Sequence, residues 1–238
     1  MWHLMATRTH LVRDCLKSPD SVSEMSEFCS TLLTVSDWEE TREAFKQATE
    51  WFVRMLPAAT GRYDEPGLGE WSIRDLVGHT SRALVTVESY LANPAASVKA
   101  SSPVEYFTLI LASSGDPVAV AQRGRDAGVA LGDNPVVSVE EIANRVLDAV
   151  MCAQANAMVT TPVGGMRLLD YLPTRTFELT VHTCDLASVL GEPIQVPKAA
   201  ATQSFAIIGG LAVETGVAAS LLLSTTGRQT LPPGFSVL

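Results

Sequence analysis

Three side chains in this sequence have the types that form an open site for a divalent metal. The chain contains four histidines, and two of them, His3 and His10, lie in a weakly patterned N-terminal segment. The candidate ligands are therefore His79 and the later pair Glu178 and His182. Two imidazole nitrogens and one carboxylate suit zinc or iron, and three protein ligands leave a coordination position open for a substrate.

Glu178 and His182 share one face of the helix that we expect around residues 175–186. With about 100° per residue and Glu178 at zero, His182 lies about 40° away, Asp185 about −20° and Arg175 about 60°. Apolar residues flank this polar stripe, and small residues, mostly threonines, lie behind it. The stripe is therefore expected to face the interior, where charged groups need partners or a metal.

An ordinary set of helical neighbours is the alternative interpretation of the same residues. Glu178 and His182 are four residues apart, and Arg175 and Glu178 are three apart, which are the spacings of common helical pairs. The Glu-x-x-x-His spacing alone favours neither interpretation. By itself His79 could also be a satisfied histidine at the edge of the core. The inward direction of the stripe favours the metal site.

The sequence predicts an almost wholly helical chain, and His79 follows a strong helix start. Ser72 can cap that helix, with Asp75 as its capping-box partner, and Trp71 is placed to pack against the entry. Pro57 is expected to end the first helix, and Pro173 to lie in the first turn of the metal-site helix. We expect the other elements to be helices over residues 37–56, 117–131, 138–158 and 197–227, a helix start or short strand over 104–111, and a turn at 162–165.

The charge and the cysteines restrict the classes of partner. The net charge of −9 argues against nucleic acid, because nothing would attract a phosphate backbone. The cysteines at 15, 29, 152 and 184 show no CxxC spacing, which is typical of a reducing compartment rather than a disulfide scaffold. The first residues have no uninterrupted apolar stretch, so we expect no export signal and a cytoplasmic protein. Met5 and Met25 are alternative initiators.

The segment from Gln203 to Ser224 is mostly apolar, but Glu214 and three glycines interrupt it. A carboxylate in the middle of a membrane span is costly, so we interpret the segment as a core helix and expect no membrane partner. Cys184 lies about −120° from Glu178 on the helical wheel and points away from it. We interpret Cys184 as a small buried residue.

At this point the motifs resemble a known family. The segment from Trp71 to His79, Trp-Ser-Ile-Arg-Asp-Leu-Val-Gly-His, resembles the first metal motif of the mycothiol-dependent maleylpyruvate isomerase family. The segment from Arg175 to Leu186 resembles the second motif, and the ending from Thr226 to Phe235 resembles tails of this family. The resemblance covers residues 37 to 238. One departure is Cys184, where family members often carry an aromatic residue.

The resemblance implies a mainly α fold, a DinB/YfiT-like four-helix bundle with a small C-terminal extension. It implies a divalent metal, usually zinc, held by His79, Glu178 and His182, and mycothiol as cosubstrate in an actinobacterial cytosol. We expect residues 1–35 to be a peripheral N-terminal extension and residues 36–190 to be the metal-binding bundle. Residues 191–238 would then be a C-terminal helix and an extended tail that pack on the bundle.

The expected function is a metal-dependent reaction of mycothiol with a small electrophilic substrate like maleylpyruvate. The reaction is either an isomerisation of the substrate or a transfer of the thiol to it through sulfur. Asp185 could orient a metal ligand or hold polar groups of the thiol. Arg175 could balance the carboxylates or receive an anionic substrate, and Arg228 is a weaker candidate for the second task. The alternative is a non-catalytic metal-binding bundle with a binding or dimerisation role. The sequence leaves open whether the chain forms a homodimer.

Overall fold

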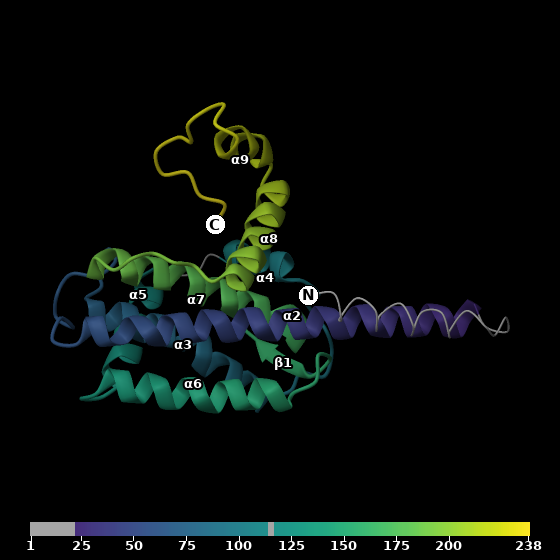
Figure 1. Cartoon of the computed structure of the whole chain (residues 1–238), viewed down its shortest axis with the longest axis horizontal. Coiled ribbons are helices and arrows are strands. Elements are labelled where there is room, and N and C mark those ends of the chain that lie inside the picture. Colours follow the sequence, from purple (N-terminus) through teal and green to yellow (C-terminus); the bar gives the residue numbers. More distant parts are fainter. Residues whose placement is uncertain (1–21, 114–116) are drawn as a thin grey trace, which may run out of the picture. The chain divides into compact units, whose positions relative to one another are not determined.

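The structure is a computed structural model that describes residues 22–113 and 117–238 (Figure 1). The chain divides into two units, Met1–Trp38 and Glu39–Leu238. The second unit holds all the predicted site residues, among which His3 and His10 are not counted. His3 and His10 lie outside the described residues, as does most of the extension expected over residues 1–35. The domain boundaries that the sequence suggests stay predictions.

Eight helices and two short strands make up the described residues, so the expectation of a mainly α fold is confirmed. The strands form one antiparallel hairpin. In chain order the elements are α2 (Val22–Ala59), α3 (Ile73–Leu91), α4 (Pro103–Ala112), α5 (Pro117–Ala130), α6 (Pro135–Cys152), β1 (Met158–Thr161), β2 (Gly164–Arg167), α7 (Leu168–Leu190), α8 (Lys198–Glu214) and α9 (Ala218–Thr225).

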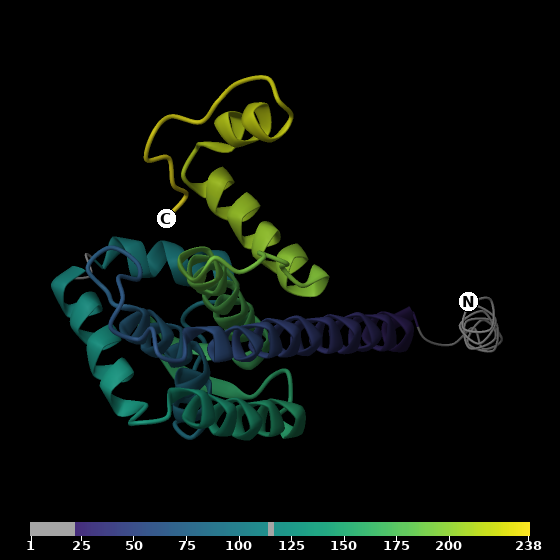
Figure 2. The same ribbon diagram turned by 60° about the vertical axis from the view of Figure 1, so that its left-hand side comes forward.

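Helix α3, which carries His79, is the central element of the bundle. It contacts α5, α6, α7 and β1, and Figures 1 and 2 show these helices gathered together. The expected capping box is present, because the Ser72 side chain accepts from the Asp75 amide and the Asp75 side chain accepts from the Ser72 amide. An apolar face with Leu76 and Leu84 fully buried then fixes the rotation of the helix. Truncating such a core leucine typically costs about 2–5 kcal/mol.

Two glycines let α3 and α5 approach at backbone distance. A Cβ atom on Gly78 would lie only 2.1 Å from the amide nitrogen of Gly128. The Arg74 side chain reinforces the contact, because its Nη1 donates to the carbonyl oxygens of Gly128 and Gly132 at 3.0 Å each. Gly128 permits this crossing of the two helices next to His79.

Helix α7 starts and ends differently from the sequence expectation. It begins at Leu168, directly after the β1–β2 hairpin, so Pro173 lies inside the helix rather than in its first turn. At the other end Gly191 adopts a left-handed conformation (φ 73°), as a C-terminal glycine often does. The Arg62 side chain then donates to the free carbonyl oxygens of Val189 and Leu190.

A loop over residues 153–157 and then the β1–β2 hairpin follow α6, where we expected one helix to reach residue 158. Helix α6 ends at Cys152, because Ala153 is extended. The two glycines of the expected turn, Gly164 and Gly165, form the start of β2. A Cβ on Gly165 would lie 2.0 Å from the carbonyl oxygen of Ser97. This glycine therefore allows the loop between α3 and α4, which contains Ser97, to pass close to β2.

Three further expectations about helices need correction or completion. Helix α2 continues past Pro57 to Ala59, since a proline in the last turn removes only one hydrogen bond. The segment at 104–111 is helical rather than a strand. The expected single helix over 197–227 is broken at Gly216 (φ 76°), and the core interpretation fails in part, because Phe205 is 68% exposed and α9 has no buried residue.

Among the described helices, none combines the length and the apolar character that a membrane span requires.

The α3–α5 crossing gives a test of the fold. Gly78→Ala should lower the free energy of unfolding by about 1–3 kcal/mol, because the new methyl group meets backbone that cannot move aside. Gly209→Ala is the matched control: it adds the same methyl group to a helix where nothing lies within 4 Å. The control should be neutral or stabilising by up to about 1 kcal/mol. Urea denaturation of both variants measures the difference, and equal stabilities would contradict the packing described.

Candidate metal centre

The structure brings His79, Glu178 and His182 together from two helices. One ligand atom from each residue lies within 4.8 Å of the others. The His182 Nε2 atom is 3.4 Å from Glu178 Oε2, and the two imidazole rings meet edge to face with centroids 4.7 Å apart. The helical spacing on α7 aligns Glu178 with His182, and the packing of α3 against α7 supplies His79.

The Asp185 carboxylate contacts the imidazole ring of His182. Its Oδ2 atom is 3.1 Å from His182 Nδ1, on the side of the ring opposite to Glu178. Histidines that bind metals commonly donate their other ring N–H to a carboxylate, which fixes the ring orientation and the tautomer. With Nδ1–H donated to Asp185, the lone pair of Nε2 is available to a metal.

The electrostatics of the three residues differ in a way that suits a cation. Burial, and then the charge of His182, lower the pKa of His79 to about 4, so its ring is neutral at neutral pH. Burial opposes charge on His182, but hydrogen bonds to Asp185 and Glu178 outweigh it and raise the pKa of His182 to about 9. Burial likewise opposes charge on Glu178, and the His182 hydrogen bond with the nearby Arg175 charge overcomes it, which lowers the pKa of Glu178.

These residues fit a divalent metal. The Nδ1 atom of His79 is buried and has no hydrogen-bond partner among the described residues, so this neutral ring keeps a nitrogen unsatisfied. The Nε2 atom of His182 and the Oε2 atom of Glu178 lie 3.4 Å apart, so both could contact one cation. Two neutral imidazoles and one carboxylate form a ligand set known for zinc sites with an open fourth position.

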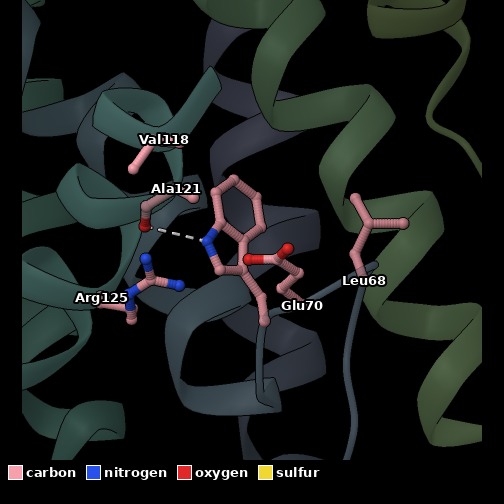
Figure 3. Close-up of a pocket in the computed structure, with 6 residues that line it drawn as sticks. Leu68, Glu70, Val118, Ala121 and Arg125 are labelled. Carbon is pink, nitrogen blue, oxygen red and sulfur yellow. Dashed lines mark hydrogen bonds between the residues drawn. The ribbon is translucent and has the colours of Figure 1, made fainter. Parts of the chain in front are cut away.

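Trp71 forms one wall of the candidate centre. Its ring lies against His79, with centroids 4.4 Å apart. The Trp71 Nε1 atom donates to the Ala121 carbonyl at 3.0 Å (Figure 3). A Cβ on Gly124 would lie 2.8 Å from the indole, so this glycine makes room for the ring. Trp71 also lines a small pocket of about 270 Å³. The lining residues of this pocket are Leu68, Glu70, Trp71, Val118, Ala121 and Arg125.

A larger cavity of about 540 Å³ opens beside the three ligand residues, and His79 and Glu178 form part of its wall. Several of its lining residues carry charged or hydroxyl groups that sequence reasoning missed. The helical wheel could have found Arg82, one turn after His79, whereas no local signal marked residues from α4 and α5. The polar and charged lining residues are His79, Arg82, Thr86, Tyr90, Tyr106, Ser113, Arg123, Arg175 and Glu178.

Arg175 lines the same cavity and is held firmly. Its guanidinium lies over the rings of Tyr106 and Tyr171, at 5.5 and 5.1 Å from their centroids. Its Nε atom donates to Thr174 Oγ1 at 3.0 Å, and its Nη2 atom donates to the Tyr106 hydroxyl at 3.4 Å. Arg175 therefore places a fixed positive charge one turn before Glu178.

Two candidates lie apart from the cavity. Arg228 is exposed, and its side chain donates only to the Thr226 carbonyl within the described part of the chain. Cys184 is half-buried and does not line the cavity, and burial followed by the charge of Asp185 raises the pKa of its thiol. The small residues expected behind the polar stripe are in fact the most buried face of α7, while the stripe is half-buried beside the cavity.

A comparison with known protein families agrees with the resemblance of these motifs. The family model of the mycothiol maleylpyruvate isomerase N-terminal domain matches residues 42–187, more than half of the chain. The chain belongs to this family. The matched segment contains all three candidate ligands, the whole of α3 and most of α7. The resemblance and the DinB-like helical bundle that the sequence suggested are confirmed. No curated protein and no solved structure gave a match.

The contact between Asp185 and His182 predicts the effect of a conservative substitution. Asp185→Asn should weaken zinc binding by about 10- to 100-fold, because the imidazole loses the carboxylate that orients it. Asp148→Asn makes the same chemical change at an exposed position of α6 and should leave the affinity unchanged. Competition titrations with a zinc chelator measure both values, and equal affinities would show that Asp185 has no supporting role.

The raised pKa of His182 predicts proton release on metal binding. Near pH 6, His182 is protonated in the metal-free protein (pKa about 9) and His79 is already neutral (pKa about 4). Zinc needs both rings neutral, so binding should release about one proton, and the apparent affinity should rise with pH until His182 titrates. Calorimetry in two buffers of different ionisation enthalpy counts the protons. No release would contradict the charge state described.

Proposed function

We propose that this chain is a metal-dependent enzyme that uses mycothiol in one of two ways. The thiol either promotes the isomerisation of a small electrophilic substrate or becomes bonded to that substrate through its sulfur atom. The observation that carries the proposal is the position of His79, Glu178 and His182 beside a cavity of about 540 Å³. A purely structural metal site is usually closed by four protein ligands, whereas three ligands beside a cavity leave room for reactants. Membership of a mycothiol-related family supports the choice of thiol.

The proposed metal is zinc, and a bound zinc ion would supply the positive charge that keeps the thiol deprotonated at neutral pH. His79 and His182 provide neutral nitrogens, and Glu178 provides the carboxylate. Asp185 keeps the His182 ring in one orientation through the contact to Nδ1. Arg175 balances the negative charge of Glu178 from a fixed place one turn away.

The cavity would hold the electrophile against the thiol sulfur. In an isomerisation, the sulfur uses a lone pair to form a bond to one carbon of an activated cis double bond, and the π electron pair of that double bond moves onto the activating carbonyl group. The former double bond becomes single and rotates, and the C–S bond then breaks to give the trans isomer and the thiolate. If a proton is captured at the carbon beside the carbonyl instead, the product is a thiol adduct.

The hydroxyl groups of the cavity are suited to donate hydrogen bonds during this reaction. Burial raises the pKa of Tyr106, and burial also raises the pKa of Tyr171, although Arg175 acts in the opposite direction on both. Both phenols therefore keep their protons at neutral pH. Tyr106 lines the cavity directly, and its hydroxyl could stabilise the charge that develops on the carbonyl oxygen.

Kinetic assays test the proposal. The zinc-loaded protein should accelerate the reaction of mycothiol with at least one member of a panel of cis enones and other small electrophiles. His182→Ala should lower the rate to the uncatalysed background, because it removes a ligand beside the cavity. Cys184→Ala should keep the activity, since this thiol lies outside the cavity and its raised pKa makes it a poor nucleophile.

Two results would oppose the proposal. If mycothiol gives no acceleration with any electrophile although the protein binds zinc, the non-catalytic metal-binding bundle is the better description. If Cys184→Ala abolishes the activity while zinc binding is intact, the reaction uses a protein thiol instead.

A further inference from the structure

The cavity beside the metal centre is positively charged in a protein that is acidic overall. The chain has a net charge of −9, yet three arginines line this cavity and Glu178 is the one carboxylate among its described lining residues. The arginines come from three helices: Arg82 from α3, Arg123 from α5 and Arg175 from α7. A cleft lined by charges of one sign concentrates ligands of the opposite sign.

The three arginines are not equivalent. Arg175 is committed to the protein through two aromatic rings and two hydrogen bonds. The guanidinium groups of Arg82 and Arg123, in contrast, form no hydrogen bond or ion pair with any residue in 22–113 or 117–238. Arg82 is half-buried and Arg123 is exposed. Both residues line the same cavity, and burial, followed by the positive charge of Arg123, lowers the pKa of Arg82.

The helix geometry gives the position of this pair relative to the metal centre. His79 meets His182, and further along α3 the Thr86 hydroxyl accepts from the Tyr171 hydroxyl at 3.1 Å, so α3 and α7 run antiparallel. Arg82 follows His79 by three residues, which places it about one helical turn, or about 5 Å, further into the cavity. An anionic group there would lie a few bonds from an atom held beside the ligand residues.

We propose that Arg82 and Arg123 form a binding site for a carboxylate of the electrophilic substrate, and that they make the reaction selective for small anionic acceptors. The selectivity of the reaction rests on the proposed function. The binding of a carboxylate at Arg82 and Arg123 does not depend on that function. The proposal moves the task of anion recognition from Arg175, which already uses two of its donors within the protein, to two arginines whose guanidinium groups have no partner among the described residues. Guanidinium groups suit a carboxylate because they can offer two parallel N–H donors.

A pair of probes that differ only in charge tests the proposal. The acid is (E)-4-oxopent-2-enoate, and the neutral control is its methyl ester. Binding of each to the zinc-loaded protein is measured by calorimetry without thiol, and kcat/KM is measured with mycothiol. Arg82→Gln and Arg123→Gln should each weaken binding of the acid by roughly 10- to 100-fold and leave the ester unchanged.

Arg125→Gln is the matched control on the same helix. Arg125 lines the small pocket beside Trp71 and its Nε donates to Gln122 Oε1, so its removal should not affect either probe. Arg82→Lys keeps the charge but not the paired donors and should give an intermediate affinity for the acid. Arg123 is exposed, so we expect Arg123→Gln to fold. This variant therefore tests the proposal even if Arg82→Gln does not fold.

The outcomes separate this proposal from the proposed function. Loss of acid binding in both glutamine variants supports the carboxylate site even if neither probe is turned over, in which case the reaction assignment alone fails. Acid binding that is unchanged in Arg123→Gln and in a folded Arg82 variant overturns the carboxylate site, even if the ester is a good substrate. An equal effect of Arg125→Gln would also overturn it, because the loss would then reflect the general charge.

Discussion

Helix α3 has to pack against α7 for any of the chemistry to exist, because His79 is far from Glu178 and His182 in the sequence. Two features fix this packing. The capping box at Ser72 and Asp75 starts the helix at one defined residue, and the apolar face with Leu76 and Leu84 sets its rotation. The glycine contact with α5 then holds α3 from the other side. A rotation of α3 by one residue, about 100°, would carry His79 out of the centre.

The candidate metal centre balances burial against charge. Burial disfavours the charged forms of Glu178 and His182, yet their mutual contact and the neighbouring Asp185 and Arg175 keep both ionised without a metal. The result is a site that already holds a negative group, an orientated imidazole and a neutral second imidazole. A cation that displaces the His182 proton would therefore find its ligands in place, which reduces the structural change that binding requires.

The sequence predicted the features that depend on short spacings. Glu178, His182 and Asp185 lie on one helix within seven positions, and the cap at Ser72 depends on residues three apart, so helix periodicity places them. The rest depends on contacts between distant segments. The stacking of Trp71 on His79 depends on Gly124 of α5, and the cavity arginine Arg123 comes from a helix with no distinctive pattern. The hairpin after α6 was missed because its strands have four residues each, too few to show alternation.

The central claim is that His79, Glu178 and His182 hold one metal ion together. Equilibrium dialysis of the metal-stripped protein against zinc, followed by elemental analysis, tests it most directly. The account predicts about one tightly bound zinc per chain for the wild type, and loss of that zinc in His79→Ala and in His182→Ala, two substitutions on different helices. A wild-type protein without stoichiometric zinc, or a folded variant that retains it fully, would contradict the account.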